Sequence, residues 1–249
     1  MLIVLPPSEG KTRPDSGPVL DLDGLSFPEL NKTRDLLVRT LIKVSATRRA
    51  ADVLGLGPTQ ADALAINVNL PAEPTARADA VFTGVLFEAA DLASLDTSAR
   101  RRADDSIVIC NGLFGLVRPG DLIPAYRLAG NAALPRIGTV TSRWKPTIPK
   151  ALDDVSDGGL VIDLRSGTYA AFGSAPAERT ATMRVLQERD GRRSVVSHFN
   201  KATKGRIVRT LLESGASPTT PSELAGTLRD LGWTIEHDGP RLDVIVTRY

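Results

Sequence analysis

The chain has 249 residues, of which 42% are hydrophobic and 24% are charged, the balance of an ordinary globular protein. Lys and Arg number 31 against 29 Asp and Glu, and a net charge of only +2 excludes a strongly basic nucleic-acid-binding arm. One cysteine and two histidines exclude an internal disulfide and a structural zinc site, and no segment approaches the roughly 20 apolar residues of a membrane-spanning helix. We therefore expect a cytoplasmic protein.

The predicted elements mix strands and helices without a regular repeat. In chain order, the predicted strands are 2–5, 80–83, 106–110, 160–163, 181–186, 194–198, 233–236 and 242–247. The predicted helices are 29–43, 46–54, 58–67, 87–95, 146–155, 200–214 and 221–231. Asp190-Gly191 predicts a hairpin turn. The pattern indicates an α+β or mixed α/β fold: a single domain over residues 1–249, with a mixed sheet and surrounding helices.

The loop after the first strand ends in Gly10-Lys11-Thr12, a sequence that invites comparison with a phosphate-binding P-loop. A P-loop would require glycine at position 5, where this sequence has Leu5 inside the strand. A weaker hypothesis survives, in which Ser8 and Lys11 bind an anion at the strand end. The alternative is a solvent loop with an incidental lysine.

Two short predicted helices are joined by Gly55-Leu56-Gly57, which is similar to a helix-hairpin-helix DNA-binding element at about residues 46–67. Two glycines allow a tight turn whose amides, with the next helix N-terminus, face a phosphate. For this element we expect at least one glycine at positive φ and amides that face solvent. The alternative is a plain glycine-capped helical turn.

A buried strand that ends at Cys110-Asn111 leads into a loop bearing Arg118 and Arg127. The carboxyl end of a buried strand is where α/β proteins place ligand contacts. We predict that both guanidinium groups reach one cationic cleft. Pairing with carboxylates such as Asp121 would instead make them structural. Cys110 itself is more typical of a core thiol than of a nucleophile.

The helix predicted at 200–214 carries lysines on its apolar face. At 100° per residue, Lys201 and Lys204 fall on the same side as Ile207 and Leu211, whereas Arg206 faces away. Lysines in a first turn oppose the helix dipole, so this placement favours a bound anion over simple snorkelling at the edge of the core.

Five blocks of the sequence together resemble the YaaA peroxide-stress protein family, in order from residue 1 to about 213. They are residues 1–8 with Lys11, 81–84, 112–119, 121–128 and 199–205. The resemblance implies a cytosolic bacterial protein of the response to hydroperoxide. It also implies a single-domain mixed fold with a positively charged cleft and a helix-hairpin-helix element, and binding of double-stranded DNA without an established enzymatic reaction.

These observations predict a DNA-binding protein of the oxidative stress response, which contacts phosphates in a positively charged cleft. The predicted contacts are Gly55, Gly57, Lys11, Arg118, Arg127, Lys201, Lys204 and Arg206. The alternative is an enzyme that acts on a nucleobase or nucleotide in the same cleft, with Ser8, Asn111 and Tyr126 as pocket lining. Double-stranded DNA is the expected partner; the sequence indicates no metal, cofactor, membrane or protein partner.

Overall fold

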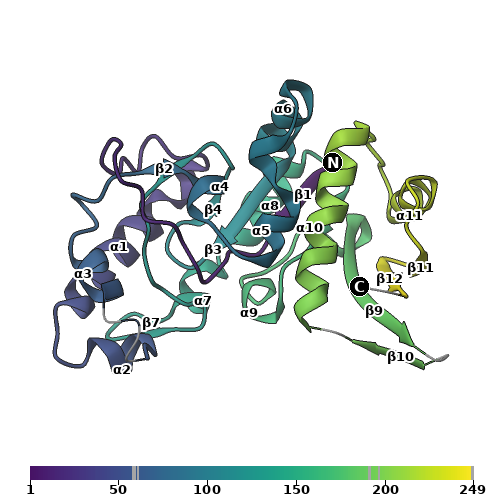
Figure 1. Cartoon of the computed structure of the whole chain (residues 1–249). Coiled ribbons are helices and arrows are strands. Elements are labelled where there is room, and N and C mark those ends of the chain that lie inside the picture. Colours follow the sequence, from purple (N-terminus) through teal and green to yellow (C-terminus); the bar gives the residue numbers. More distant parts are fainter. Residues whose placement is uncertain (58–59, 61, 190–191, 196, 248–249) are drawn as a thin grey trace.

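A mixed sheet runs through the molecule in the computed structural model, which describes residues 1–57, 60, 62–189, 192–195 and 197–247 (Figure 1). Its strand order is β11-β12-β9-β8-β1-β3-β4, and β10 pairs with β9. Two further pairs, β2 with β5 and β6 with β7, form small separate sheets. The strands are β1 (Leu2–Leu5), β2 (Ala76–Arg77), β3 (Ile107–Asn111), β4 (Gly115–Val117), β5 (Leu122–Ile123), β6 (Ala133–Leu134), β7 (Gly138–Thr139), β8 (Val161–Asp163), β9 (Thr180–Arg189), β10 (Arg192–Val195), β11 (Ile235–Asp238) and β12 (Arg241–Val246).

The helices pack around this sheet and at its two ends (Figure 1). They are α1 (Asn31–Ser45), α2 (Ala50–Leu54), α3 (Asp62–Val68), α4 (Ala78–Val81), α5 (Val85–Ala90), α6 (Thr97–Ser106), α7 (Val140–Trp144), α8 (Ile148–Ser156), α9 (Gly167–Ala170), α10 (Ser197–Ser214) and α11 (Pro221–Asp230), with short 3-10 helices η1 (Pro28–Leu30), η3 (Leu92–Ser94) and η4 (Ala177–Arg179). The mixed α/β fold class predicted from the sequence is confirmed.

The centre of the sheet is parallel and buried on both faces. Strand β1 pairs in parallel with β3 on one side and β8 on the other, so that Ile3 lies between Ile107 and Ile162. Every residue of β1 is buried, because a parallel strand covered on both faces requires a continuous apolar run. The buried apolar side chains form one cluster that extends from β1 to β12, as expected for a single domain.

A buried arginine of α1 lies against edge strand β4, at one end of the sheet. Arg34 has no exposed surface, and its guanidinium donates hydrogen bonds to the carbonyl oxygens of Phe114 (2.9 Å) and Leu116 (2.7 Å) along edge strand β4. It also donates to the carbonyl oxygen of Ser26 (2.7 Å) and to Oδ1 of Asn31 (2.8 Å). Burial lowers the pKa of Arg34 to about 10. The side chain thus supplies donors that a further strand would otherwise provide.

Helix α10 lies against α5 at close range, and the two are adjacent in Figure 1. The approach depends on Gly205, because a Cβ atom there would lie 2.3 Å from the carbonyl oxygen of Leu86 and 2.9 Å from the Cβ of Ala89. Glycine therefore sits in the middle of a long helix for a packing reason.

Three sequence predictions of local structure were wrong. Residues 80–83 are not a strand: α4 ends at Val81, and the amide of Phe82 donates to the carbonyl of Ala78 (2.9 Å). The helix predicted at 87–95 ends at Ala90, because Asp91 has a left-handed backbone with φ of 40°. The strand predicted at 194–198 ends at Val195, and α10 begins at Ser197. The hairpin is confirmed by antiparallel pairing of β9 with β10, although Asp190-Gly191 itself lies outside the described residues.

Candidate anion-binding site

The carboxyl ends of β1, β3 and β8 lie at one edge of the sheet, because these strands pair in parallel. Three segments bearing polar side chains leave the sheet at this edge: the Ser8–Lys11 loop after β1, Asn111 at the end of β3, and Asp163 with Arg165 after β8. Ligand sites in open α/β sheets concentrate at such an edge.

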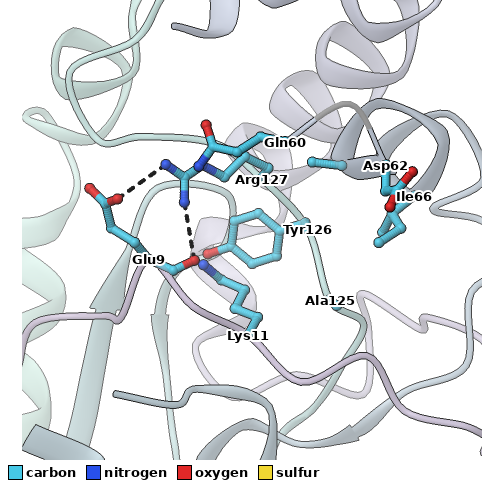
Figure 2. A pocket seen from close by; sticks show the side chains of 9 residues that line it. Glu9, Lys11, Gln60, Asp62, Ile66, Ala125, Tyr126 and Arg127 are labelled. Atoms are coloured by element: carbon cyan, nitrogen blue, oxygen red, sulfur yellow. Dashed lines mark hydrogen bonds and ion pairs between the residues drawn. The ribbon is translucent and has the colours of Figure 1, made fainter. Parts of the chain in front are cut away.

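A pocket of about 240 Å³ opens beside this edge (Figure 2). Its walls come from three separated parts of the chain, namely the loop after β1, the start of α3 and the segment that follows β5. The lining residues are Glu9, Lys11, Gln60, Asp62, Ala63, Ile66, Ala125, Tyr126 and Arg127. Lys11 and Arg127, both predicted from the sequence as anion-binding residues, are therefore brought together.

Lys11 is held between aromatic rings. Its Nζ lies 4.6 Å from the ring centroid of Tyr126 and 5.2 Å from that of Phe82, and it donates a hydrogen bond of 2.9 Å to the carbonyl oxygen of Ser8. Burial and the positive charge of Arg127 lower the pKa of Lys11 to about 7, against the opposing effect of the Glu9 carboxylate. The amine is thus easily deprotonated near neutral pH.

Arg127 is fixed through its backbone and loosely paired through its side chain. Its amide donates to Oδ1 of Asn67 (2.8 Å), and its carbonyl accepts from Nδ2 of the same residue (2.9 Å). The guanidinium donates to Oε2 (3.1 Å) and to the carbonyl oxygen (3.2 Å) of Glu9, which lies 118 residues away in the sequence. The Glu9 side chain is 83% exposed, and such an exposed ion pair is weak enough for an incoming anion to replace it.

Tyr126 is anchored from behind the pocket by Asn111. Its hydroxyl donates a hydrogen bond of 2.7 Å to Oδ1 of Asn111, which also accepts from the amide of Phe114 (2.9 Å). Burial raises the pKa of the Tyr126 phenol above its ordinary value. Asn111 is fully buried and positions Tyr126, whereas Ser8 uses its hydroxyl to donate to the carbonyl of Gly10 (2.5 Å).

The two lysines of α10 do not share one environment. Lys204 is buried and donates a hydrogen bond of 3.3 Å to the carbonyl oxygen of Leu164, just after β8, and burial lowers its pKa. Lys201 is exposed, so the prediction that both lysines point inward was wrong for Lys201. Arg206 is exposed, as predicted.

Arg118 does not reach the pocket. Its Nη1 donates to the carbonyl oxygens of Asp104 (3.2 Å) and Asp105 (2.7 Å) at the end of α6, and its guanidinium lies 5.7 Å from the ring centroid of Phe27. The prediction that Arg118 and Arg127 meet was therefore wrong. The reason is a local turn in which Asp121 accepts from the Arg118 amide (2.9 Å) and directs the side chain toward α6.

The described part of the glycine hairpin does not confirm a helix-hairpin-helix element. Gly55 ends α2 with φ of 64°, as expected for either a DNA-binding hairpin or a capped helix. The amide of Leu56 donates to Ala51 (2.9 Å), and that of Gly57 donates to Oε1 of Gln60 (3.1 Å). These amides therefore already donate hydrogen bonds within the segment and do not face a phosphate. Residues 58, 59 and 61 lie outside the described part of the chain.

Sequence reasoning missed a buried ion pair beside the site. Arg165 donates to both carboxylate oxygens of Asp163 (2.9 and 2.6 Å) and to the carbonyl of Gly173 (2.8 Å). Its Nη1 also lies 3.8 Å from Sγ of Cys110. Burial nevertheless raises the pKa of the Cys110 thiol to about 11, so this cysteine is a core group. The Asp-x-Arg spacing after a predicted strand was the available signal.

The protein thus has a mixed α/β fold with a small pocket beside the carboxyl edge of its parallel strands, lined by the basic residues Lys11 and Arg127 and the acidic residues Glu9 and Asp62. None of the described helices is long and apolar enough to cross a membrane. The described residues also contain no group of three or more His, Cys, Asp or Glu side chains that could hold a metal ion.

The family model described as peroxide stress protein YaaA matches residues 1–238, and the chain belongs to this family. A UPF0246 protein of Streptomyces coelicolor is 43% identical over 99% of this chain and 98% of its own. UPF0246 proteins of Corynebacterium efficiens (40%, 98% of both chains) and Corynebacterium glutamicum strain R (38%, 96% of both chains) are also similar.

The lowered pKa of Lys11 predicts a pH-dependent stability. The unfolded chain keeps a proton on this lysine up to about pH 10.5, whereas the folded chain loses it near 7. Between these values the unfolded state binds more protons, so stability rises with pH. Compared with wild type, a Lys11→Met variant should gain stability as pH falls from 10 to 6, by up to about 3 kcal/mol.

Urea denaturation at pH 6 and pH 9.5 measures this difference directly. Lys150→Met is the control, because Lys150 lies on the surface and pairs only with Asp154 at 2.7 Å among the contacts of the described residues. A stability difference for Lys11→Met that stays constant across this pH range would contradict the assigned burial of the amine.

Proposed function

We propose that this member of the peroxide stress family is a DNA-binding protein whose Lys11–Arg127 pocket receives a backbone phosphate. The supporting observation is the meeting of these two cations at the carboxyl edge of the sheet, opposed by the exposed carboxylate of Glu9. Arginine forms bidentate contacts with phosphate, and the partly buried Lys11 adds a point charge because an adjacent phosphate favours its protonated form. Phosphate contacts of this kind position a protein on DNA without reading its sequence.

Lys201 and Arg206 extend the proposed contact surface. Both are exposed on α10, and Lys204 of the same helix reaches the backbone that follows β8, next to β1 in the sheet. Several separate cations suit a polymer of phosphates better than a single small ligand. Gly55 and Gly57 would contribute to this surface only if their segment rearranged, because the described amides there already have partners.

A second candidate is an enzyme that acts on a nucleobase or nucleotide in the same pocket. The aromatic ring of Tyr126 and the reactive state of Lys11 favour it. The volume of about 240 Å³ favours DNA instead, because pockets for drug-sized ligands measure roughly 300–1,000 Å³. The pocket suits one phosphate and its sugar better than a complete nucleotide.

The salt dependence of duplex binding tests the proposal. Each phosphate contact that is lost should lower the slope of log K against log[salt] by about 1. We expect Arg127→Gln and Lys11→Gln each to weaken binding of a duplex of mixed sequence and to reduce this slope. Fluorescence anisotropy between about 50 and 200 mM salt measures both the affinity and the slope. Lys150→Gln should change neither quantity.

Unchanged affinity and slope in folded Arg127→Gln and Lys11→Gln variants would disprove phosphate binding in this pocket. A nucleoside monophosphate that binds wild type more tightly than the duplex, and loses affinity with Arg127→Gln, would favour the enzyme.

A further inference from the structure

The Lys11 amine lies at the wall of the pocket. Within the described part of the chain, its one hydrogen bond is to the carbonyl oxygen of Ser8 (2.9 Å), and no ion pair of those residues involves it. The amine faces the rings of Tyr126 and Phe82 (Figure 2 shows the first), and it contributes to the pocket wall. A neutral amine in this position can keep that hydrogen bond and still present its lone pair.

Arg127 supplies two conditions for reactivity at Lys11. Burial is the main reason that the pKa of Lys11 falls to about 7, and the positive charge of Arg127 adds to it by disfavouring protonation of the neighbouring amine. Lysines activated by desolvation and by an adjacent cation attack carbonyl carbon. The same guanidinium lines the pocket and offers a site for an anionic group on the carbonyl compound.

We propose that Lys11 forms a Schiff base with an aldehyde that carries a phosphate group, with Arg127 holding the phosphate. This activity goes beyond DNA binding, although it rests on the proposed role of Arg127 as the phosphate-binding residue. Two kinds of ligand carry both an aldehyde and a phosphate: a free phosphorylated aldehyde, and the ring-opened sugar of an abasic site in DNA. The small volume of the pocket suits either one.

The step balances without an oxidant or a metal. The Nζ lone pair attacks the carbonyl carbon and forms a C–N bond, while the carbonyl π electrons move to oxygen, which takes a proton. The nitrogen loses one proton, the new hydroxyl takes a second proton, and the C–O bond breaks to release water while the nitrogen lone pair forms the C=N bond. Loss of the remaining proton from nitrogen leaves the neutral imine. We assign the transfer of these protons to Glu9, a pocket-lining carboxylate whose charge acts on Lys11 and which an incoming phosphate would release from Arg127.

Reductive trapping of the full-length protein tests the proposal. The protein is incubated with glyceraldehyde 3-phosphate and cyanoborohydride, which reduces the imine to a stable amine, and labelled peptides are quantified by mass spectrometry. We expect Lys11 to be labelled at least about tenfold faster than Lys150, with a half-maximal rate near the Lys11 pKa of about 7. Inorganic phosphate should compete.

Variants separate the amine from the phosphate site. Lys11→Arg should abolish the adduct while it retains the positive charge, so duplex binding should persist. Arg127→Gln should slow labelling by glyceraldehyde 3-phosphate much more than labelling by propionaldehyde, which has no phosphate and loses only the effect of the Arg127 charge on the Lys11 pKa. If the wild-type protein binds the duplex but shows no trapping at Lys11, the Schiff base alone is refuted. If the wild-type protein is trapped at Lys11 but does not bind the duplex, the proposed function alone is refuted.

A duplex with one abasic site distinguishes the two sources. A trapped protein–DNA adduct at Lys11, formed faster than the adduct with glyceraldehyde 3-phosphate at equal concentration, assigns the site to abasic DNA; the reverse order assigns it to a free phosphorylated aldehyde. Labelling of Lys11 no faster than Lys150 in the wild-type protein overturns the proposal, and this comparison holds even if Lys11→Arg fails to fold.

Discussion

Replacement of Arg34 by methionine should destabilise the protein by about 2–6 kcal/mol, because two buried carbonyl oxygens lose their donor at about 1–3 kcal/mol each. The guanidinium donates to the backbone carbonyls of Phe114 and Leu116, both in buried residues, and methionine fills similar space without donors. These carbonyl oxygens would then lack the partner that they now have, and an unsatisfied buried acceptor costs about 1–3 kcal/mol. Equilibrium denaturation in urea measures the loss.

Arg39→Met is the matched control on the same helix. Arg39 is exposed and forms an ion pair with Asp35 one turn away, and such surface pairs contribute about 0.3–0.5 kcal/mol. Arg34→Lys should behave like Arg34→Met in direction, because one ammonium group cannot reproduce the planar fork that reaches several carbonyls. An Arg34→Met variant as stable as Arg39→Met would show that edge strand β4 does not depend on these donors.

Two glycine-to-alanine substitutions in helices should have opposite effects on stability. In α10, Gly205→Ala would place a Cβ 2.3 Å from the carbonyl oxygen of Leu86, so α5 and α10 must separate. Overpacking of this kind typically costs about 1–3 kcal/mol. In α11, a Cβ at Gly226 meets nothing within 4 Å, and Gly226→Ala should stabilise by up to about 1 kcal/mol, the difference in helix propensity.

Thermal and urea unfolding of both variants distinguish packing from propensity. If Gly205→Ala is as stable as wild type, or gains stability like Gly226→Ala, the close contact between α5 and α10 is absent in solution.

The apolar pattern predicted the centre of the sheet because a strand buried on both faces leaves a continuous run of aliphatic residues, as in β1 and β3. It failed at residues 80–83, where four apolar and small residues fit a helical turn as well as a strand. In the candidate site, Lys11 and Arg127 were predicted to share one cleft, and both line the pocket.

Arginine side chains were harder to place. Arg118 has the same local setting as Arg127, yet it contacts the end of α6, which approaches only in the folded protein. Arg34 is one of several basic residues in the sequence of α1, yet it is fully buried. A guanidinium can donate hydrogen bonds to water, to a phosphate or to a set of backbone carbonyls. Which of these partners it has depends on its neighbours in the folded protein.

The position of β1 in the sheet has a consequence for the order of folding. Residues 2–5 pair with 107–109 on one side and 161–163 on the other, so the earliest strand in the sequence has no neighbour until a large part of the chain has been synthesised. Closing such long loops has an entropic cost that local contacts cannot offset early. The apolar segment Leu2–Leu5 therefore stays without its strand neighbours until those later segments are available, and an unpaired apolar strand is prone to aggregation during folding.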